Sequence, residues 1–364
     1  MASRRNFLKI VGGGVVLAAG SAAGFALTRT PTKALAPWEV AGTYEEPRMR
    51  ALSYAILAPN PHNRQPWVVD LARQGEIAIW RDMDKRLPET DPYDRQLTIG
   101  MGCFLEQLAV AASTTGHKVT YDLFPAGDGG PVAVARLEEG ASEDPLFRHV
   151  MNRRSCKEPF EPQAVEVDQR LAALADIHTD DPLVDQLRQL TWDAWMIEAT
   201  TYRTMKESTD LFRLGKAEVN ANPDGIDFSG PFFETLILTG MMTREGSLDP
   251  TSFEFAQGAE IYETMLKATP AYAVVRTAGN SREDQIEAGR RWLRLNLTTT
   301  ALGLALHPVS QALQEYPEMD KHYKAAHDLL AEPGETVQML GRLGYGPQTP
   351  LTPRWPLEAK IMDG

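Results

Sequence analysis

The sequence predicts an α+β protein in which one chain of 364 residues contains two related halves. Apolar stretches of helical length alternate with pairs of strand-like runs, which favours antiparallel or mixed sheets packed by long helices. The length fits two domains or one large domain. One glycine spacing also recurs: Gly102 and Gly116 lie 14 residues apart around a predicted helix, and so do Gly289 and Gly303.

The first predicted half covers residues 37–140 and begins with a polar lead-in at 37–46. Short turns rich in glycine separate the strand-like runs, and Gly116 is expected to end the long apolar helix. The expected helices are 49–57 and 99–115, and the expected strands are 67–71, 76–80, 117–124 and 131–137.

The second predicted half covers residues 141–364. Expected helices are 145–154, 168–176, 182–203 and 283–306, and expected strands are 234–238 and 272–276. Asparagine, glycine and proline make 215–232 look irregular. The insertion 215–258 also carries Met241, Met242, Phe253 and Phe255, and we expect it to cover a bound ring as a lid, the alternative being a plain surface insertion.

Charge and motif content exclude several classes of function. The net charge is −12, and because residues 1–36 hold five basic residues and no acid, the rest carries −17. Such an acidic body is a poor partner for nucleic acid. Two cysteines, Cys103 and Cys156, are too few for an iron–sulfur cluster or a cysteine zinc site. No self-sufficient catalytic motif occurs, so we expect neither a catalytic side-chain set nor a metal.

The N-terminus, residues 1–36, resembles a twin-arginine export signal. Ser3-Arg4-Arg5-Asn6-Phe7-Leu8-Lys9 matches its pattern, and the 18 residues 10–27 carry no charge. The resemblance implies the twin-arginine translocation machinery as a partner and a periplasmic destination, and it raises the expectation of a redox cofactor inserted before export. Small residues suggest cleavage near 34–36 or 21–23; without cleavage, 10–27 is a short inner-membrane anchor. An ordinary transmembrane anchor is the alternative.

The loop 59–67 combines prolines with amide side chains before a predicted strand. Asn63 and Gln65 offer both donors and acceptors, as the pyrimidine edge of an isoalloxazine ring requires, and Pro59 and Asn60 stand beside them. The alternative is a loop whose amides satisfy only its own backbone.

Two further segments offer arginines. Arg153 and Arg154, followed by Ser155, suit a terminal phosphate, because guanidinium groups donate charge-assisted hydrogen bonds and the hydroxyl adds another. Arg354 near the C-terminus is a weaker candidate for the same phosphate. A solvated basic turn, or pairing with the acidic surface, is the alternative.

Together these segments resemble the flavin-dependent nitroreductase family. Its N-x-Q-P-W loop is similar to residues 63–67 and its R-R-S motif to residues 153–155. Family members are usually homodimers that bind FMN between subunits. Here the loop precedes R-R-S by about 90 residues, which resembles the single-chain, Acg-type branch, in which two halves imitate the dimer. The resemblance implies a nitroreductase-like fold, a monomer acting as a pseudo-dimer, and one FMN site per chain.

The resemblance implies a function carried by the cofactor. Reduced FMN would pass electrons to a small-molecule acceptor such as a nitroaromatic or a quinone. The alternative is an exported protein that binds or sequesters flavin without efficient turnover, since NAD(P)H is a cytoplasmic donor. A structural exported protein without cofactor is a third possibility.

Overall fold

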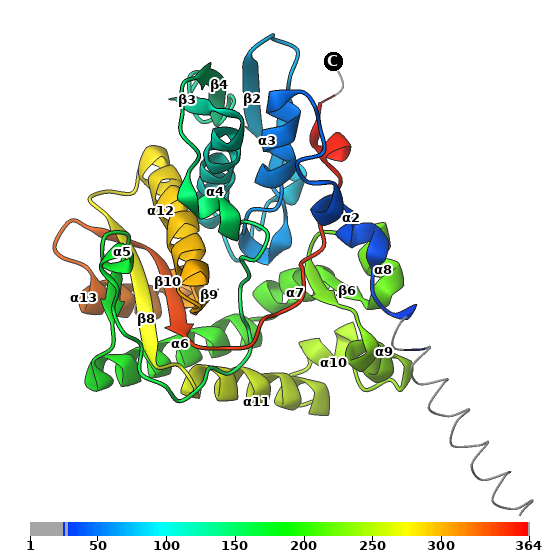
Figure 1. The fold of residues 1–364 in the computed structure, drawn as a ribbon. Coiled ribbons are helices and arrows are strands. Elements are labelled where there is room, and N and C mark those ends of the chain that lie inside the picture. The colour runs from blue at the N-terminus through cyan, green and yellow to red at the C-terminus, as the bar shows by residue number, and fades with distance from the viewer. Residues whose placement is uncertain (1–24, 26–27, 363–364) are drawn as a thin grey trace, which may run out of the picture.

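The computed structural model describes residue 25 and residues 28–362, and the remaining residues are drawn as a grey trace in Figure 1. The predicted anchor, 10–27, lies almost wholly outside the described residues, and the export signal stays a prediction. Among the described residues, one helix, Arg95–Thr115, is long and apolar enough to span a membrane. Because 89% of its apolar window is buried inside the protein, it is a core helix here.

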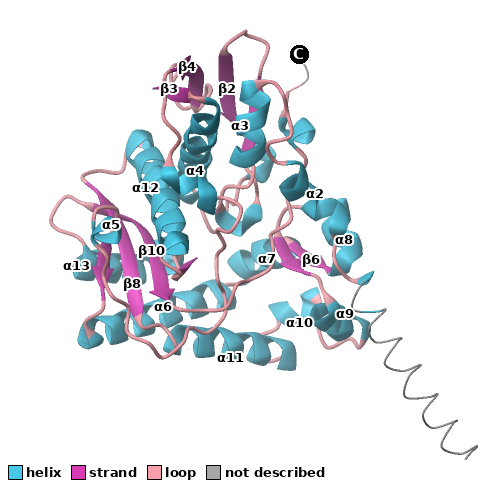
Figure 2. Ribbon diagram, in the orientation of Figure 1, coloured by secondary structure: helices cyan, strands magenta, loops and turns pink. Residues whose placement is uncertain are grey.

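Two four-stranded antiparallel sheets form the frame of the molecule (Figure 2). The first has the strand order β1-β2-β4-β3 and the second β5-β8-β10-β9. The first contains β1 (Trp67–Asp70), β2 (Glu76–Arg81), β3 (His117–Leu123) and β4 (Ala133–Glu139). The second contains β5 (Asp176–His178), β8 (Ala271–Thr277), β9 (Ala305–Pro308) and β10 (Thr336–Gly344). A parallel pair, β6 (Phe212–Leu214) and β7 (Ile226–Phe228), stands apart.

The two sheets have the same topology. In each, two strands are followed by a long helix and then by two more strands, the last of which returns to pair with the second. The helices are α4 (Arg95–Ala112) and α12 (Arg282–Ala301), which pack against each other between the sheets (Figure 1). The predicted α+β fold with two pseudo-symmetric halves is therefore confirmed.

The recurring glycines lie where the two central helices touch. Gly102 and Gly289 are each the eighth residue of their helix, and a Cβ on Gly289 would lie 2.8 Å from the Cα of Gly102. A side chain on either would also overlap the facing backbone, at the carbonyls of Ile286 and Ile99. The repeat seen in the sequence is thus a close helix crossing, which only glycine permits.

The other helices cover this frame. The first half carries α2 (Thr32–Val40) and α3 (Pro47–Ala55), and the second carries α5 (Gln169–Ala172) and α13 (Asp320–Leu330). A long insertion between β5 and β8 forms the remainder (Figure 2). It contains α6 (Asp181–Thr200), α7 (Tyr202–Asp210), α8 (Gly215–Ala221), α9 (Pro231–Leu238), α10 (Arg244–Leu248) and α11 (Phe253–Lys267).

Four predicted elements differ in the structure. The segment 215–232 is ordered as α8, β7 and the start of α9, and 234–238 is helix rather than strand. Gly230, at φ +93, and Pro231 at the first turn start α9 there. The helix expected at 283–306 ends at Ala301 because Gly303 takes φ +71. The helix expected at 145–154 is only a 3-10 turn, Pro145–His149.

Each half sends its trailing segment across to the other sheet. After β4, residues 140–168 run along the second sheet, where Cys156 N donates to Leu306 O (3.1 Å) and Glu161 N to Tyr345 O (2.8 Å). After β10, residues 345–362 return to the first sheet, where Met362 N donates to Val69 O (2.8 Å; Figure 1). We call these segments the first arm and the second arm.

Candidate functional site

The two arms bring together three arginines that are far apart in the sequence. Arg153 and Arg154 lie on the first arm and Arg354 on the second. Nη2 of Arg153 and Nη2 of Arg354 both donate to the carbonyl of Leu57, each at 3.0 Å. Arg154 reaches the second arm itself, because its Nε donates to Thr349 O at 3.3 Å. The predicted phosphate residues therefore form one cluster, the arginine cluster.

No carboxylate among the described residues pairs with the arginine cluster. The indole ring of Trp38 lies against it, with ring-centre distances of 5.1 Å to Arg154 and 5.9 Å to Arg354. Burial lowers the pKa of Arg153 to about 10, and burial together with the charges of Arg153 and Arg154 lowers the pKa of Arg354 to about 9. The cluster thus carries positive charge that the described protein groups leave uncompensated.

Three buried donors at the cluster lack a hydrogen-bond partner within the described part of the chain. They are Nε of Arg153, Nε of Arg354 and Nδ2 of Asn296, the last on α12 with its Oδ1 3.5 Å from Arg153 Nη1. All three residues are at most 3% exposed. Since buried donors are nearly always paired, this set lacks an acceptor. The chemistry of the cluster therefore fits an anion such as a phosphate.

The amide side chains of loop 59–67 are engaged by the protein itself. Asn63 Oδ1 accepts from Arg354 Nη1 (2.6 Å), and Asn60 Oδ1 accepts from the backbone N of Gln65 (2.7 Å). Gln65, fully buried, donates to Pro223 O (2.7 Å) and accepts from Trp355 N (2.9 Å). The amides therefore do more than satisfy the loop's own backbone, because Asn63 and Gln65 bind Arg354, Pro223 and Trp355 outside the loop. Because these amide side chains are engaged by protein groups, the loop would meet a ligand with its backbone and its shape.

The backbone of this loop is strained. His62, Asn63 and Gln65 have φ between 48 and 51, in the left-handed region that favours glycine. Strain of this kind costs on the order of 1–3 kcal/mol per residue and persists only where surrounding contacts enforce it. The hydrogen bonds of Asn63 and Gln65 to the second arm supply that enforcement.

The remaining predicted residues lie at the edges of the cluster. Ser155 and Pro59 are half-buried, and within the described residues the Ser155 hydroxyl makes no hydrogen bond. The predicted lid, 215–258, is held to the loop 59–67 near the start of the lid, because Gly225 N donates to Asn63 O (3.3 Å). Phe255, expected in a lid, is buried, whereas Phe253 is exposed. The lid stays a prediction.

Sequence reasoning gave no role to Lys157 and His62. Lys157 is solvent-exposed, and desolvation by the surrounding protein, partly offset by Asp227, lowers its pKa. Burial lowers the pKa of His62 and of His307, and the charge of Lys157 adds to both shifts. The available signal was position: Lys157 follows Arg153-Arg154-Ser155 by two residues, and His62 lies in the loop.

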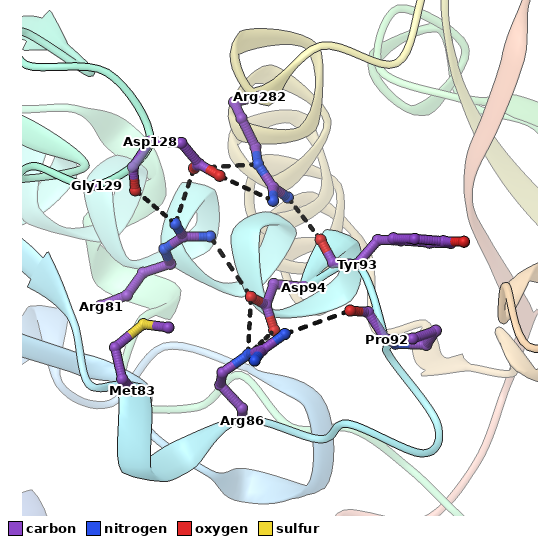
Figure 3. A pocket seen from close by; sticks show the side chains of 9 residues that line it. All are labelled: Arg81, Met83, Arg86, Pro92, Tyr93, Asp94, Asp128, Gly129 and Arg282. Atoms are coloured by element: carbon purple, nitrogen blue, oxygen red, sulfur yellow. Dashed lines mark hydrogen bonds and ion pairs between the residues drawn. The ribbon is translucent and has the colours of Figure 1, made fainter.

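A separate surface cavity of about 470 Å³ lies at the start of α4 and α12 (Figure 3). Arginine and aspartate side chains point toward one another across it. Arg86 Nε donates to Asp94 Oδ1 and Arg81 Nη2 to Asp128 Oδ1, both at 2.8 Å, and Arg282 pairs with Asp128. None of the predicted site residues lines this cavity. Its charges are paired, and the Arg282–Asp128 pair links the two halves.

Comparison with known proteins identifies the family. No family model matches the chain. It is 32% identical over 299 residues to the probable NAD(P)H nitroreductase PigM of Serratia sp. (strain ATCC 39006), covering 75% of this chain and 82% of that protein. It is 24% identical over 324 residues to the putative NAD(P)H nitroreductase acg of Mycobacterium tuberculosis, covering 85% and 93%.

Among solved structures, the FMN-dependent nitroreductase NfnB from Mycobacterium smegmatis, in complex with NADPH, aligns with a TM-score of 0.38 at 18% identity, covering 60% of this chain and 98% of that chain. A nitroreductase with bound FMN from Bacteroides fragilis aligns with a TM-score of 0.33 at 12% identity, covering 58% and 94%. On the extent and identity of its match to PigM, this chain belongs to the NAD(P)H nitroreductase family.

Proposed function

We propose that the protein is an FMN-dependent oxidoreductase that reduces nitroaromatic or quinone-type acceptors. The observation that carries the proposal is the arginine cluster, where three cations have no carboxylate partner among the described residues and three buried donors lack an acceptor. A phosphate monoester supplies both the negative charge and the acceptor oxygens. Arg153, Arg154 and Arg354 would hold the FMN phosphate, with the Ser155 hydroxyl as a further donor.

The isoalloxazine ring would lie along the 59–67 loop, on the side of Lys157. FMN, when bound, supplies hydride transfer, so the protein's part is to position the ring and the acceptor. The loop's second-arm contacts keep its shape fixed for that task.

We further propose that the protein is exported by the twin-arginine route and acts as a monomer whose two halves imitate a dimer. It would be periplasmic, or anchored in the inner membrane through residues 10–27. One observation bears on processing: α2 spans Thr32–Val40, Ala34 is buried, and its N donates to Asn220 Oδ1 (3.0 Å). Cleavage after residue 36 would divide this helix and separate Ala34 from Trp38, which lies on the arginine cluster. Cleavage near 21–23, or none, leaves α2 whole.

The alternative is a protein that sequesters flavin without efficient turnover, which export away from NAD(P)H would favour. One anaerobic experiment separates the two. The purified chain is loaded with FMN, and NADPH is added, followed by a nitroaromatic. Bleaching of the flavin and its recovery on adding the acceptor support the enzyme. A flavin that stays oxidised after NADPH is added supports sequestration. A chain that binds no FMN overturns both proposals.

A further inference from the structure

A series of hydrogen bonds leads from the loop 59–67 to helices α7 and α6 of the insertion between β5 and β8. His62 Nε2 lies 3.2 Å from Ser208 Oγ on α7, and Ser208 Oγ donates to Glu198 Oε1 on α6 at 3.4 Å. The other carboxyl oxygen, Glu198 Oε2, accepts from Gln314 Nε2 at 3.0 Å. This series therefore joins a buried carboxyl group to the loop that lies beside the arginine cluster.

Glu198 is a buried carboxyl group without a cation partner among the described residues. It is 8% exposed and lies in the last turn of α6, where the helix dipole disfavours a negative charge. Burial, with the nearby Glu207, raises its pKa to about 7. The groups that face it are Ser208 and Glu207 from α7, Gln311 and Gln314 from the turn after β9, Tyr262 from α11, and Tyr316. Glu198 is thus able to hold a proton near neutral pH.

His62 stands at the other end of this series of hydrogen bonds, near enough to Lys157 to feel its charge. Burial and the charges of Lys157 and Arg64 lower the pKa of His62 to about 4, so its ring is neutral at pH 7. A neutral imidazole accepts a proton at one nitrogen while it donates from the other. Ser208 Oγ, as both donor and acceptor, connects the two groups.

We propose that Glu198, acting through Ser208 and His62, supplies the proton that the acceptor takes up when it is reduced in this site. The inference rests on the proposed function. For a quinone, a hydride equivalent from the reduced flavin and one proton give the hydroquinone and oxidised flavin. With Glu198 protonated, its carboxyl group donates to Ser208 Oγ and the Ser208 hydroxyl donates to His62 Nε2, the reverse of the bond that an ionised carboxylate accepts. His62 gives the proton on its other ring nitrogen to the quinone oxygen, takes the hydroxyl proton of Ser208, Ser208 takes the carboxyl proton of Glu198, and solvent reprotonates Glu198.

Glu198 and Ser208 are positioning and relay residues, and His62 is the group that faces the acceptor. Glu198 and Ser208 belong to the insertion between β5 and β8, which has no counterpart in the first half, whereas His62 lies in the loop 59–67 of the first half. The insertion therefore supplies the buried proton source, and the first half supplies the imidazole that delivers the proton.

The test uses full-length, FMN-loaded protein, with Glu198→Gln to keep the hydrogen bonding and remove the titration. Glu263→Gln, on α11, is the control with the same charge change; Glu263 is partly exposed and pairs with Lys267. In the wild type and in Glu263→Gln, the rate of acceptor reduction by the prereduced protein should fall as pH rises through about 7, because Glu198 loses its proton. Glu198→Gln should be at least tenfold slower below pH 7, with a flat profile, and Ser208→Ala should behave like it.

A second readout needs no flavin. Because folding raises the pKa of Glu198, its contribution to stability is full below about 4.5, the pKa of the unfolded chain, and is lost as pH rises through about 7. Glu198→Gln should lack that loss in thermal unfolding. A Glu198→Gln protein that binds flavin and keeps the wild-type rate profile overturns the relay alone. A wild type that binds no flavin overturns the relay together with the proposed function.

Discussion

Arg154→Gln should weaken FMN binding while leaving riboflavin binding unchanged. Arg154 is half-buried, and within the described residues its guanidinium donates only to the backbone carbonyls of Met151, Arg153 and Thr349. The substitution therefore breaks no ion pair in this part of the chain. Riboflavin lacks the phosphate, so the difference between the two ligands isolates the phosphate contact. One charge-assisted hydrogen bond contributes about 1.5–3 kcal/mol, which corresponds to a roughly 10- to 140-fold higher Kd for FMN.

The same substitution should stabilise the ligand-free protein. Burial is the largest cause of the lowered pKa of Arg354, and the charges of Arg153 and Arg154 lower it further, as expected for repulsion among the three cations. Removing one charge relieves that repulsion, so the melting temperature without ligand should rise while FMN affinity falls. Flavin fluorescence titration and thermal unfolding measure the two effects.

The control is Arg148→Gln, an exposed arginine in the 3-10 turn Pro145–His149 that carries the same charge change. It should alter neither affinity. Equal weakening of FMN and riboflavin by Arg154→Gln would mean that the arginine supports the loop, and unchanged FMN affinity would mean that no phosphate binds at the cluster.

Other predictions concern the frame of the site. Gly102→Ala should destabilise the fold by about 1–3 kcal/mol or more, because α4 and α12 must separate to admit the methyl group. Gly258→Ala, which points into open space on α11, should stabilise the fold by about 0.5–1 kcal/mol. Chemical denaturation that ranks the two variants the other way would contradict the close helix crossing. Gln65→Ala should cost about 1–3 kcal/mol for each buried group left unpaired and should reduce flavin retention on gel filtration, and full retention would show that the loop is dispensable. The mass of the exported protein should place its N-terminus before Thr32, and a mass that starts after residue 36 would refute the role of α2 and Trp38.

Much of the frame follows from local sequence physics. The hairpin between β1 and β2 was predictable, and so was the end of the helical stretch after α4 and its 3-10 turn Ser113–Thr115, at Gly116 with φ +76. Alternating apolar residues and a left-handed glycine determine these features locally. Two glycines spaced alike in both halves predicted the pseudo-symmetry, and the structure gives the reason in the helix crossing.

The site was predictable only in part. The motif 153–155 and Arg354 could be picked out because arginine suits a phosphate wherever it stands in the sequence. Their proximity could not be predicted, because it depends on two arms that cross between the halves. The partners of Gln65 are backbone groups of Pro223 and Trp355, which no side-chain pattern reveals. The helix α9 was predicted as a strand because its apolar residues form one short run without a helical spacing. Most of them are not buried, so packing does not impose such a spacing.

The relay could not be predicted for a similar reason. Glu198 is one of many acidic residues in the sequence, and only the packing of α6 against α7 removes it from solvent and directs it toward Ser208. Its raised pKa is a property of tertiary structure.

The most direct test of the central claim is the visible absorption spectrum of the wild-type protein and of an Arg153→Gln/Arg154→Gln variant. Both are mixed with FMN and passed through gel filtration. We predict that the wild type retains the flavin bands in about equimolar amount and that the variant, folded by circular dichroism, loses them. A wild type that emerges colourless, or a variant that retains FMN as well as the wild type, would contradict the account.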